Sequence, residues 1–228
     1  MRKRPVGPKV DPLLPGNTPD MRPLHGRWVW LEPVLVVKHA KALYESFAGS
    51  DPHGHIWTYL GYGPWDGFEQ FEAWLKEREA SRDPWFYAFI RRGDGKACGM
   101  GAFMRCDAVN GVIEIGHIWL SPALQQTREA TEAIFLMIRH CFDDLGVRRL
   151  EWKCDALNAP SRRAAERFGF TYEGTFRQHF IVKGRNRDTA WYAMLDKDWH
   201  GVRQAFETWL APENFDGEGR QKAKLQVA

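Results

Sequence analysis

Hydrophobic residues follow two different periods along this chain, and together these periods predict a mixed α/β domain. Apolar side chains alternate with polar ones, or run continuously, over three neighbouring segments that are separated by tight-turn signals. Because short turns such as Asn110-Gly111 join antiparallel neighbours, we expect the three segments to form an antiparallel sheet. The segments are residues 85–91, 97–104 and 112–120, and the other turn is Arg92-Gly93-Asp94-Gly95.

A helical period replaces the strand pattern after residue 127. Apolar side chains then fall on one helix face at intervals of three and four, namely Ala130, Ala133, Ile134, Met137, Ile138 and Cys141. A further strand is expected at residues 149–155, so two strands flank one helix and should run parallel with a right-handed crossover. Ligands of such units bind beyond the carboxyl ends of the strands, where free amides of the next helix favour phosphate.

The outer parts of the chain carry weaker patterns. Residues 1–25 hold six of the thirteen prolines and five Lys or Arg residues, which predicts an extended arm that wraps the domain or is partly disordered. Such a basic arm could touch nucleic acid or a partner, or be a solvated tail. The other expected elements are a strand at 27–33, helices at 39–47 and 66–80, a helix from Asn158 to Gly169, strands at 170–172, 176–183 and 188–195 with a turn at Gly184-Arg185-Asn186, and a helix at 199–210.

Composition narrows the class of protein. The 228 residues are 44% hydrophobic and 27% charged, which excludes wholesale disorder. The net charge of +3 is too small to indicate a nucleic-acid partner, and the absence of long apolar runs predicts no membrane span and no secretory signal. The four cysteines match no metal or disulfide spacing, which favours reduced thiols in a cytoplasmic protein. His53 and His55 lie close together without further ligands, so no metal is expected.

Several motifs in the middle of the chain resemble the GCN5-related N-acetyltransferases, and most of all the ribosomal-protein N-terminal acetyltransferases. The resemblance covers roughly residues 26–200. It implies a mixed, mostly antiparallel sheet that is splayed between its fourth and fifth strands and flanked by helices, and it implies acetyl-CoA as donor. The motifs are Glu114-Ile115-Gly116-His117-Ile118-Trp119-Leu120-Ser121-Pro122 with Gln125 and Ala130-Thr131-Glu132-Ala133, then Asn158-Ala159-Pro160-Ser161-Arg162 with Arg167-Phe168-Gly169-Phe170, and finally Tyr172-Glu173-Gly174, Arg177 and Asp188.

The same resemblance implies a set of coenzyme-binding residues. A loop of six residues would hold the CoA pyrophosphate with its backbone amides: Gln125, Gln126, Thr127, Arg128, Glu129 and Ala130. A backbone amide near Trp119 or Leu120 would bind the oxyanion, and Asn158 would contact the pantetheine, cap the helix, or do both. Arg162, Arg163 and Arg167 could reach the 3′-phosphate or be solvated.

Arg128 stands where the family has glycine, which leaves three interpretations open. The backbone there could be strained, it could be helical with the guanidinium on the phosphates, or Arg128 could be a surface residue. Glu129 and Glu132 suit the helix dipole but would repel a pyrophosphate.

Candidate groups for proton transfer come from the two motifs. Glu114 matches the position of the family's general base, although it could instead be a strand residue paired with an arginine. His117 is an alternative base, but alternation places it on the opposite face of the strand. The tyrosine that serves many members as acid is replaced by Ala165, so Ser161 is the candidate acid near the CoA sulfur, unless it only caps the helix. The aromatic loop at residues 56–65 and the hairpin at residues 176–188 are expected to shape the acceptor pocket.

These observations lead to one functional hypothesis and one alternative. The chain is expected to be an acetyl-CoA-dependent N-acetyltransferase that acetylates a primary amine directly, either a protein N-terminus or a small amine. Arg128 and Ala165 motivate the alternative, a catalytically silent acyl-CoA binder that acts through partners. The expected organisation is an arm at 1–25, a catalytic domain at 26–200, and a C-terminal helix with a polar tail at 201–228, with a homodimer as a possible assembly.

Overall fold

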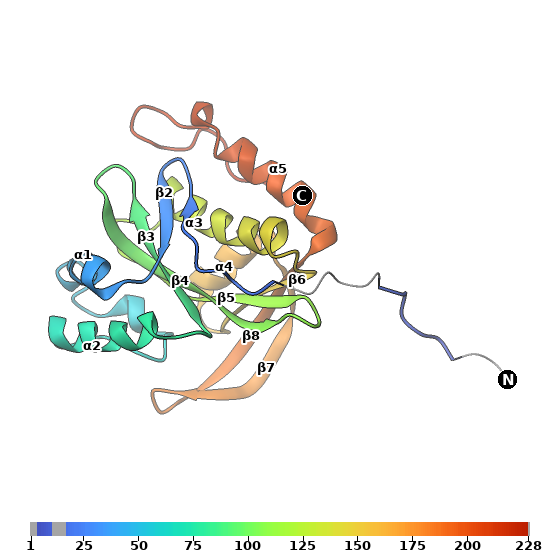
Figure 1. The fold of residues 1–228 in the computed structure, drawn as a ribbon, viewed down its shortest axis with the longest axis horizontal. Helices are drawn as coiled ribbons and strands as arrows, with labels where there is room; N and C mark the ends of the chain where they lie inside the picture. The colour runs from blue at the N-terminus through green and yellow to red at the C-terminus, as the bar shows by residue number, and fades with distance from the viewer. Residues whose placement is uncertain (1–3, 11–16, 228) are drawn as a thin grey trace.

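A computed structural model describes residues 4–10 and 17–227 of the chain and shows one twisted sheet covered by helices (Figure 1). The sheet order is β1-β2-β3-β4-β5-β6-β8-β7, and every neighbouring pair is antiparallel except β5 with β6. The strands are β1 (Leu24–His25), β2 (Val29–Pro33), β3 (Trp85–Arg91), β4 (Lys96–Asp107), β5 (Val112–Leu120), β6 (Arg149–Asp155), β7 (Thr171–Val182) and β8 (Arg185–Leu195). The α-helices of the described residues are α1 (Val36–Ala48), α2 (Phe68–Glu79), α3 (Arg128–Arg139), α4 (Ala159–Arg167) and α5 (Asp196–Trp209).

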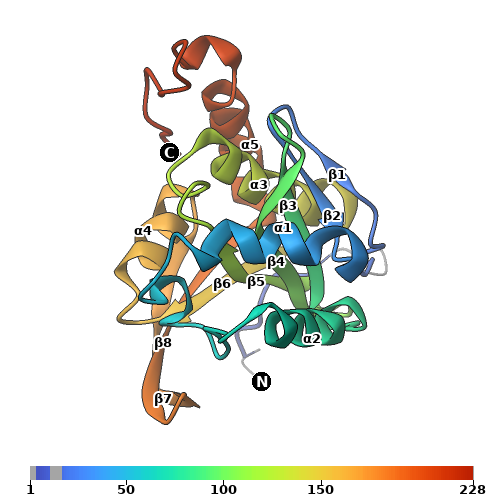
Figure 2. The same ribbon diagram turned by 90° about the vertical axis from the view of Figure 1, so that its left-hand side faces the viewer.

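Alternating side chains of the central strands supply a core on each face of the sheet. Phe86, Ala88 and Ile90 of β3 pack on the side that α1 and α2 cover. Tyr87 and Phe89 point the other way, into the core that α3 and α5 cover. Figure 2 shows α1 in front of the sheet, with α3 and α5 behind it. No helix in the described part of the chain is both long and apolar enough to cross a membrane.

Most of the expected strands and helices are confirmed, and the differences lie at their ends. β3, β5 and β6 have the predicted bounds, and β5 runs parallel to β6 as expected. The region expected as two strands at 170–172 and 176–183 is one strand, β7, because register shifts bend it without ending it. The turn before β8 is Lys183-Gly184, not residues 184–186 as expected, and both residues have positive φ, at 48° and 71°.

The sheet is splayed between β5 and β6, as the resemblance implied. These strands pair only at Val112↔Arg149, Ile113↔Leu150 and Glu114↔Glu151. β5 continues to Leu120 and β6 to Asp155, and β6 pairs along its whole length with β8 instead. Counted from β2, the splayed strands are the fourth and fifth.

The N-terminal edge of the sheet is fixed by one buried carboxylate. Glu132 of α3 accepts hydrogen bonds from the backbone N–H groups of Arg27, Trp28 and Val29, at 2.7, 2.7 and 2.9 Å. Gly26 is required beside it, because a Cβ there would lie 2.5 Å from the carboxyl carbon. The expectation that Glu132 faces a pyrophosphate is therefore wrong, since its carboxylate serves the β1–β2 turn. β1 itself lies inside the segment expected as an arm.

The C-terminal segment also packs onto the domain. Phe215 and Leu225 are buried, Phe215 bridges to Gln221, and Nε1 of Trp209 donates to Oε1 of Gln221 over 3.0 Å. The segment expected as a polar tail thus carries apolar anchors that hold it near the N-terminus of α3.

We predict that Glu132→Ala destabilises the protein by about 3 kcal/mol, because each buried N–H group left without an acceptor costs about 1–3 kcal/mol. Urea unfolding followed by circular dichroism measures the change. Glu129→Ala is the matched control from the first turn of the same helix. Glu129 contacts Arg128, Oε1 to Nε at 3.3 Å, and its loss should cost less than about 1 kcal/mol. Equal effects of the two substitutions would contradict the anchoring role of Glu132.

Candidate active site

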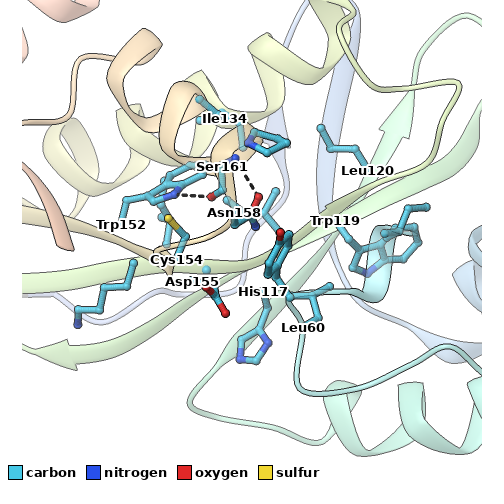
Figure 3. Close-up of a pocket in the computed structure, with 18 of the residues that line it drawn as sticks. Leu60, His117, Trp119, Leu120, Ile134, Trp152, Cys154, Asp155, Asn158 and Ser161 are labelled. Carbon is cyan, nitrogen blue, oxygen red and sulfur yellow. Dashed lines mark hydrogen bonds between the residues drawn. The ribbon is translucent and has the colours of Figure 1, made fainter. Parts of the chain in front are cut away.

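A cavity of about 830 Å³ opens where β5 and β6 separate (Figure 3). Its walls come from β5, β6, β8, the loop at residues 50–61 and the N-terminal ends of α3 and α4. Apart from the arginines of α4, the sequence names twelve candidate site residues, with His117 counted as the alternative base. Ten of them line this cavity: Glu114, His117, Trp119, Leu120, Gln125, Gln126, Thr127, Ala130, Asn158 and Ser161. Arg128 and Glu129 line a second cavity of about 600 Å³, which shares Gln126, Thr127, Thr131 and Arg167 with the first.

A bulge in β5 turns His117 into the cavity. The register passes from Ala102↔Gly116 to Met100↔Trp119, so β5 carries one extra residue, and His117 has a φ of 50°. A β-bulge resets the alternation of side chains. The expectation that His117 lies opposite Glu114 is therefore wrong. The His117 ring lies 5.2 Å from that of Phe86, on the side of α1 and α2, whereas Ile113 and Ile115, which flank Glu114, face the other core.

The surroundings of His117 keep its imidazole neutral. Burial lowers the pKa of His117 to about 4, and nearby arginines add to this effect. The ring stacks on Tyr62, with centroids 5.6 Å apart, and its Nδ1 lies 3.3 Å from the Tyr62 hydroxyl. A neutral imidazole in the cavity can accept a proton, although its lowered pKa makes it a weak base.

Glu114 lies at the point where β5 and β6 part, in a network of charged side chains. Its neighbour in register is Glu151, and Nζ of Lys153 lies 2.9 Å from Oε2 of Glu114 and 2.6 Å from Oε2 of Glu151. Arg105 Nη1 lies 3.4 Å from the same Glu114 oxygen, and Lys153 Nζ stands 4.0 Å from the centroid of the Trp191 ring. Burial raises the pKa of Glu114, while Lys153 and Arg105 oppose that rise.

The loop before α3 presents free backbone donors. Gln126 has a φ of 60°, and Thr127 caps α3 by accepting from the Ala130 N–H over 3.1 Å. Within the described part of the chain, no backbone or side-chain acceptor is found for the N–H groups of residues 126–129. Successive amides at a left-handed residue and a helix N-terminus form a concave anion site, so this loop fits a phosphate group.

Arg128 occupies the first turn of α3 in ordinary helical conformation. Of the alternatives left open, strained backbone at Arg128 is thereby excluded, and the positive φ falls on Gln126 instead. The guanidinium carbon lies 4.9 Å from the Trp28 ring centroid and 5.5 Å from that of Phe215. Residues from both the N-terminal and the C-terminal part of the chain therefore hold the Arg128 side chain, at the second cavity.

The start of α4 places a hydroxyl and an amide against the first cavity. Asn158 caps the helix by accepting from the Ser161 N–H over 3.1 Å. Ser161 Oγ accepts from Trp152 Nε1 over 3.0 Å, which leaves its own proton free to donate (Figure 3). Cys154 lies beside it, and burial raises the pKa of that thiol. A protonated thiol is a poor nucleophile, which argues against a covalent acyl-cysteine.

The other arginines of α4 have different surroundings. Arg162 Nε donates to the Tyr192 hydroxyl over 3.1 Å, so it is engaged by the sheet. Arg163 is exposed. Arg167 Nη1 donates to Thr131 Oγ1 over 3.1 Å and lines both cavities, which makes it the α4 cation closest to the shared opening.

The aromatic loop at residues 56–65 lines the cavity and also covers part of the core. Trp57 is buried and packs against Trp65, with ring centroids 4.7 Å apart, so part of the loop closes the core. Tyr59 and Leu60 line the cavity. Among the described residues, no group of three or more His, Cys, Asp or Glu side chains is arranged to hold a metal ion.

Three cations of the cavity were not named as candidates from the sequence. Arg105 and Arg187 lie just beyond the predicted strand ends, because β4 and β8 each extend three residues further at that end than expected. Lys153 carried a usable signal, because a lysine inside a strand predicted to be buried requires a partner.

Comparison with known proteins matches this architecture to one family. The profile of the acetyltransferase (GNAT) domain matches residues 29–171. A crystal structure of a GCN5-related N-acetyltransferase from Brucella melitensis is 48% identical, with a TM-score of 0.90 over 93% of this chain and 96% of that chain. YdaF of Bacillus subtilis (strain 168), named as a candidate ribosomal N-acetyltransferase, is 32% identical over 110 residues, which span 48% of this chain and 60% of that protein. RimJ of Mycobacterium smegmatis, in complex with CoA-disulfide, shares the fold at 21% identity, with a TM-score of 0.63 over 75% of this chain and 83% of that chain.

We predict that Lys153→Met destabilises the protein by about 3 kcal/mol at pH 8, because it leaves two glutamates buried in register without their shared cation. Without Lys153 the pKa of Glu114 rises further, so the glutamate takes up a proton more readily in the folded than in the unfolded state. The loss should therefore shrink as the pH falls toward 4. Urea unfolding at both pH values measures it.

Lys76→Met is the matched control for this charge removal. Lys76 pairs with Glu72 at 3.1 Å on an exposed helix face, so its loss should cost less than about 0.5 kcal/mol at either pH. A Lys153→Met deficit that does not change with pH would contradict the electrostatic account.

Proposed function

Because the chain belongs to the acetyltransferase (GNAT) family, we propose that it transfers the acetyl group of acetyl-CoA directly to a primary amine, either a protein N-terminus or a small amine. The observation that carries this proposal is the continuous cavity between β5 and β6. At one end it reaches the free amides before α3, and at the other it reaches Glu114 and His117. A donor with a phosphate group and an acceptor amine can therefore meet from opposite sides.

The residues at the α3 end fit the coenzyme. The amides of residues 126–129 suit its pyrophosphate, and Arg167 supports them from α4 at the opening shared by the two cavities. The pantetheine would run along β5 past Trp119 and Leu120, where backbone amides can bind the developing oxyanion. The side-chain NH₂ of Asn158 is free to donate, since its oxygen is used by the helix cap. Ser161 would pass a proton to the departing thiolate and take one back from water, so that its hydroxyl is restored.

The amine must lose a proton before it attacks, because an α-ammonium group has a pKa of about 8. Glu114 is the proposed base. Its raised pKa makes it a stronger proton acceptor than an exposed glutamate, and Lys153 and Arg105 hold it in place. His117 lies closer to the bulge, and its lowered pKa weakens it as a base. A bridging water between the amine and Glu114 would complete the transfer.

The similarity to YdaF favours a protein N-terminus as acceptor, since that protein is named for ribosomal N-acetylation. The match covers less than two thirds of YdaF, so this preference concerns the class of acceptor and not its identity.

We predict that acetyl-CoA raises the midpoint of thermal unfolding by several degrees, because a ligand at about 100 times its Kd adds about 2.7 kcal/mol, and each kcal/mol is worth about 2–4 °C. Release of the CoA thiol should then follow when N-terminal peptides or small primary amines are added. A shift of the midpoint without thiol release from any amine would support the silent binder. No shift at millimolar acetyl-CoA would contradict the coenzyme site itself.

We further predict that Glu114→Gln lowers kcat by about 100-fold at pH 7, while the acetyl-CoA shift of the unfolding midpoint stays the same. The defect should narrow above about pH 9, where an α-amine loses its proton unaided. His117→Gln, in the same cavity, should lower kcat by less than about tenfold. The opposite order of the two defects would make His117 the base and would contradict the role given to Glu114.

A further inference from the structure

One cation of the cavity lacks a counter-charge. Arg187 of β8 lines the cavity and is half-buried, and its side chain forms no hydrogen bond or ion pair with another described residue. Its Nε is shielded from solvent without an acceptor. Thr189, two residues along the same strand face, is fully buried, and its hydroxyl also lacks a partner. Unpaired polar groups beside a cavity are costly, and they therefore point to a ligand.

The acidic residues near Arg187 are all engaged elsewhere. Glu114 is paired with Lys153 and Arg105. Asp155 accepts from the Leu157 N–H over 2.8 Å. Asp188, next to Arg187 in the chain, accepts from the Gln178 N–H over 2.8 Å and from Asn186 Nδ2 over 2.9 Å. Arg187 is thus a cation of this end of the cavity with which no carboxylate of the described residues forms an ion pair.

Arg187 lies at the acceptor end, near the reacting groups. Burial lowers the pKa of His117 and the charge of Arg187 adds to this, whereas in Cys154 the same charge opposes the rise in pKa that burial causes; both residues line the cavity. Its guanidinium carbon lies 5.8 Å from the ring centroid of Phe180, which also lines the cavity. The β7–β8 hairpin that carries both residues extends away from the body of the domain (Figure 1).

Building on the proposed function, we propose that the acceptor carries a carboxylate close to its amine and that the guanidinium of Arg187 binds this carboxylate. A guanidinium matches a carboxylate with two parallel hydrogen bonds, which fixes the orientation of the acceptor as well as its charge. The amine at the other end of such an acceptor then points toward Glu114 and His117. The carboxylate could be the α-carboxylate of a free amino acid or the side chain of Asp or Glu near the start of a peptide.

Paired acceptors that differ in this charge test the proposal, compared at equal concentrations of unprotonated amine because the carboxylate also raises the pKa of its neighbouring ammonium group. The pairs are alanine against alaninamide for the first source, and amidated peptides that begin Ser-Asp or Asp-Ala against Ser-Asn or Asn-Ala for the second. We expect kcat/KM to favour the acid about tenfold or more in at least one pair, mainly through KM, because hydrogen bonds to charged groups are strong. The pair that shows the preference identifies the source.

Variants of β8 connect the preference to Arg187. Arg187→Gln should bring the ratio of acid to amide close to one, and Arg187→Lys should give an intermediate ratio, because lysine keeps the charge but not the paired geometry. Arg185→Gln, an exposed arginine two residues earlier on β8, is the control and should keep the wild-type ratio. Equal use of acids and amides by the wild-type protein, or a preference that survives Arg187→Gln, would overturn the proposal.

A second readout keeps this inference separate from the proposed function. The same pairs are compared as ligands, by their shift of the unfolding midpoint in the presence of CoA. If no acceptor is acetylated but acids still stabilise the protein more than amides, and only with Arg187 present, the carboxylate site stands and the proposed transfer fails. Acetylation that is indifferent to charge, with no difference in the midpoint shift, leaves the transfer intact and overturns the carboxylate site.

Discussion

Parallel pairing between β5 and β6 ends after three residue pairs, and the geometry of the candidate site depends on this early end. β6 satisfies its backbone by pairing with β8, and β5 leaves the pair through a bulge at His117. The carboxyl ends of β5 and β6 therefore diverge within the sheet, while β5 stays paired with β4 and β6 stays paired with β8. The opening between them is the cavity, and the helices that follow each strand, α3 and α4, place their N-termini at its rim.

Charged side chains gather at the point where β5 and β6 part. Parallel register places Glu114 beside Glu151, and Lys153 bridges both from β6, while Arg105 and Arg149 supply a second cation to Glu114 and to Glu151. A carboxylate is thus kept in a buried position next to the acceptor path, where burial and the two cations act on its pKa in opposite directions. At the other end, α3 is held by both chain termini, through Glu132 under the β1–β2 turn and through Arg128 between Trp28 and Phe215. This packing explains how a non-glycine residue is accommodated at position 128.

The sequence predicted the parts of this structure that depend on periodicity and on short motifs. The helix face beginning at Ala130 and the turn at Asn110-Gly111 located α3 and the β4–β5 hairpin, and most of the candidate site residues line one cavity. Features that depend on contacts between distant parts of the chain could not be predicted from the sequence pattern. The bulge that redirects His117 is set by pairing with β4, and the orientation of Glu132 is set by backbone donors 103–105 residues away. Arg105 and Arg187 were not predicted as strand residues, because the residue at which a strand ends depends on the strands that pair with it and not on its own sequence alone.

The account rests on a coenzyme whose pyrophosphate binds the free amides before α3, and backbone hydrogen exchange tests that contact most directly. Exchange of individual amides is measured by mass spectrometry or NMR with and without saturating CoA. The account predicts slower exchange for the amides of residues 126–129 and for the start of α4, because new acceptors close their N–H groups to water. Unchanged exchange at residues 126–129, with protection confined to the β7–β8 hairpin or to the face covered by α1 and α2, would contradict it.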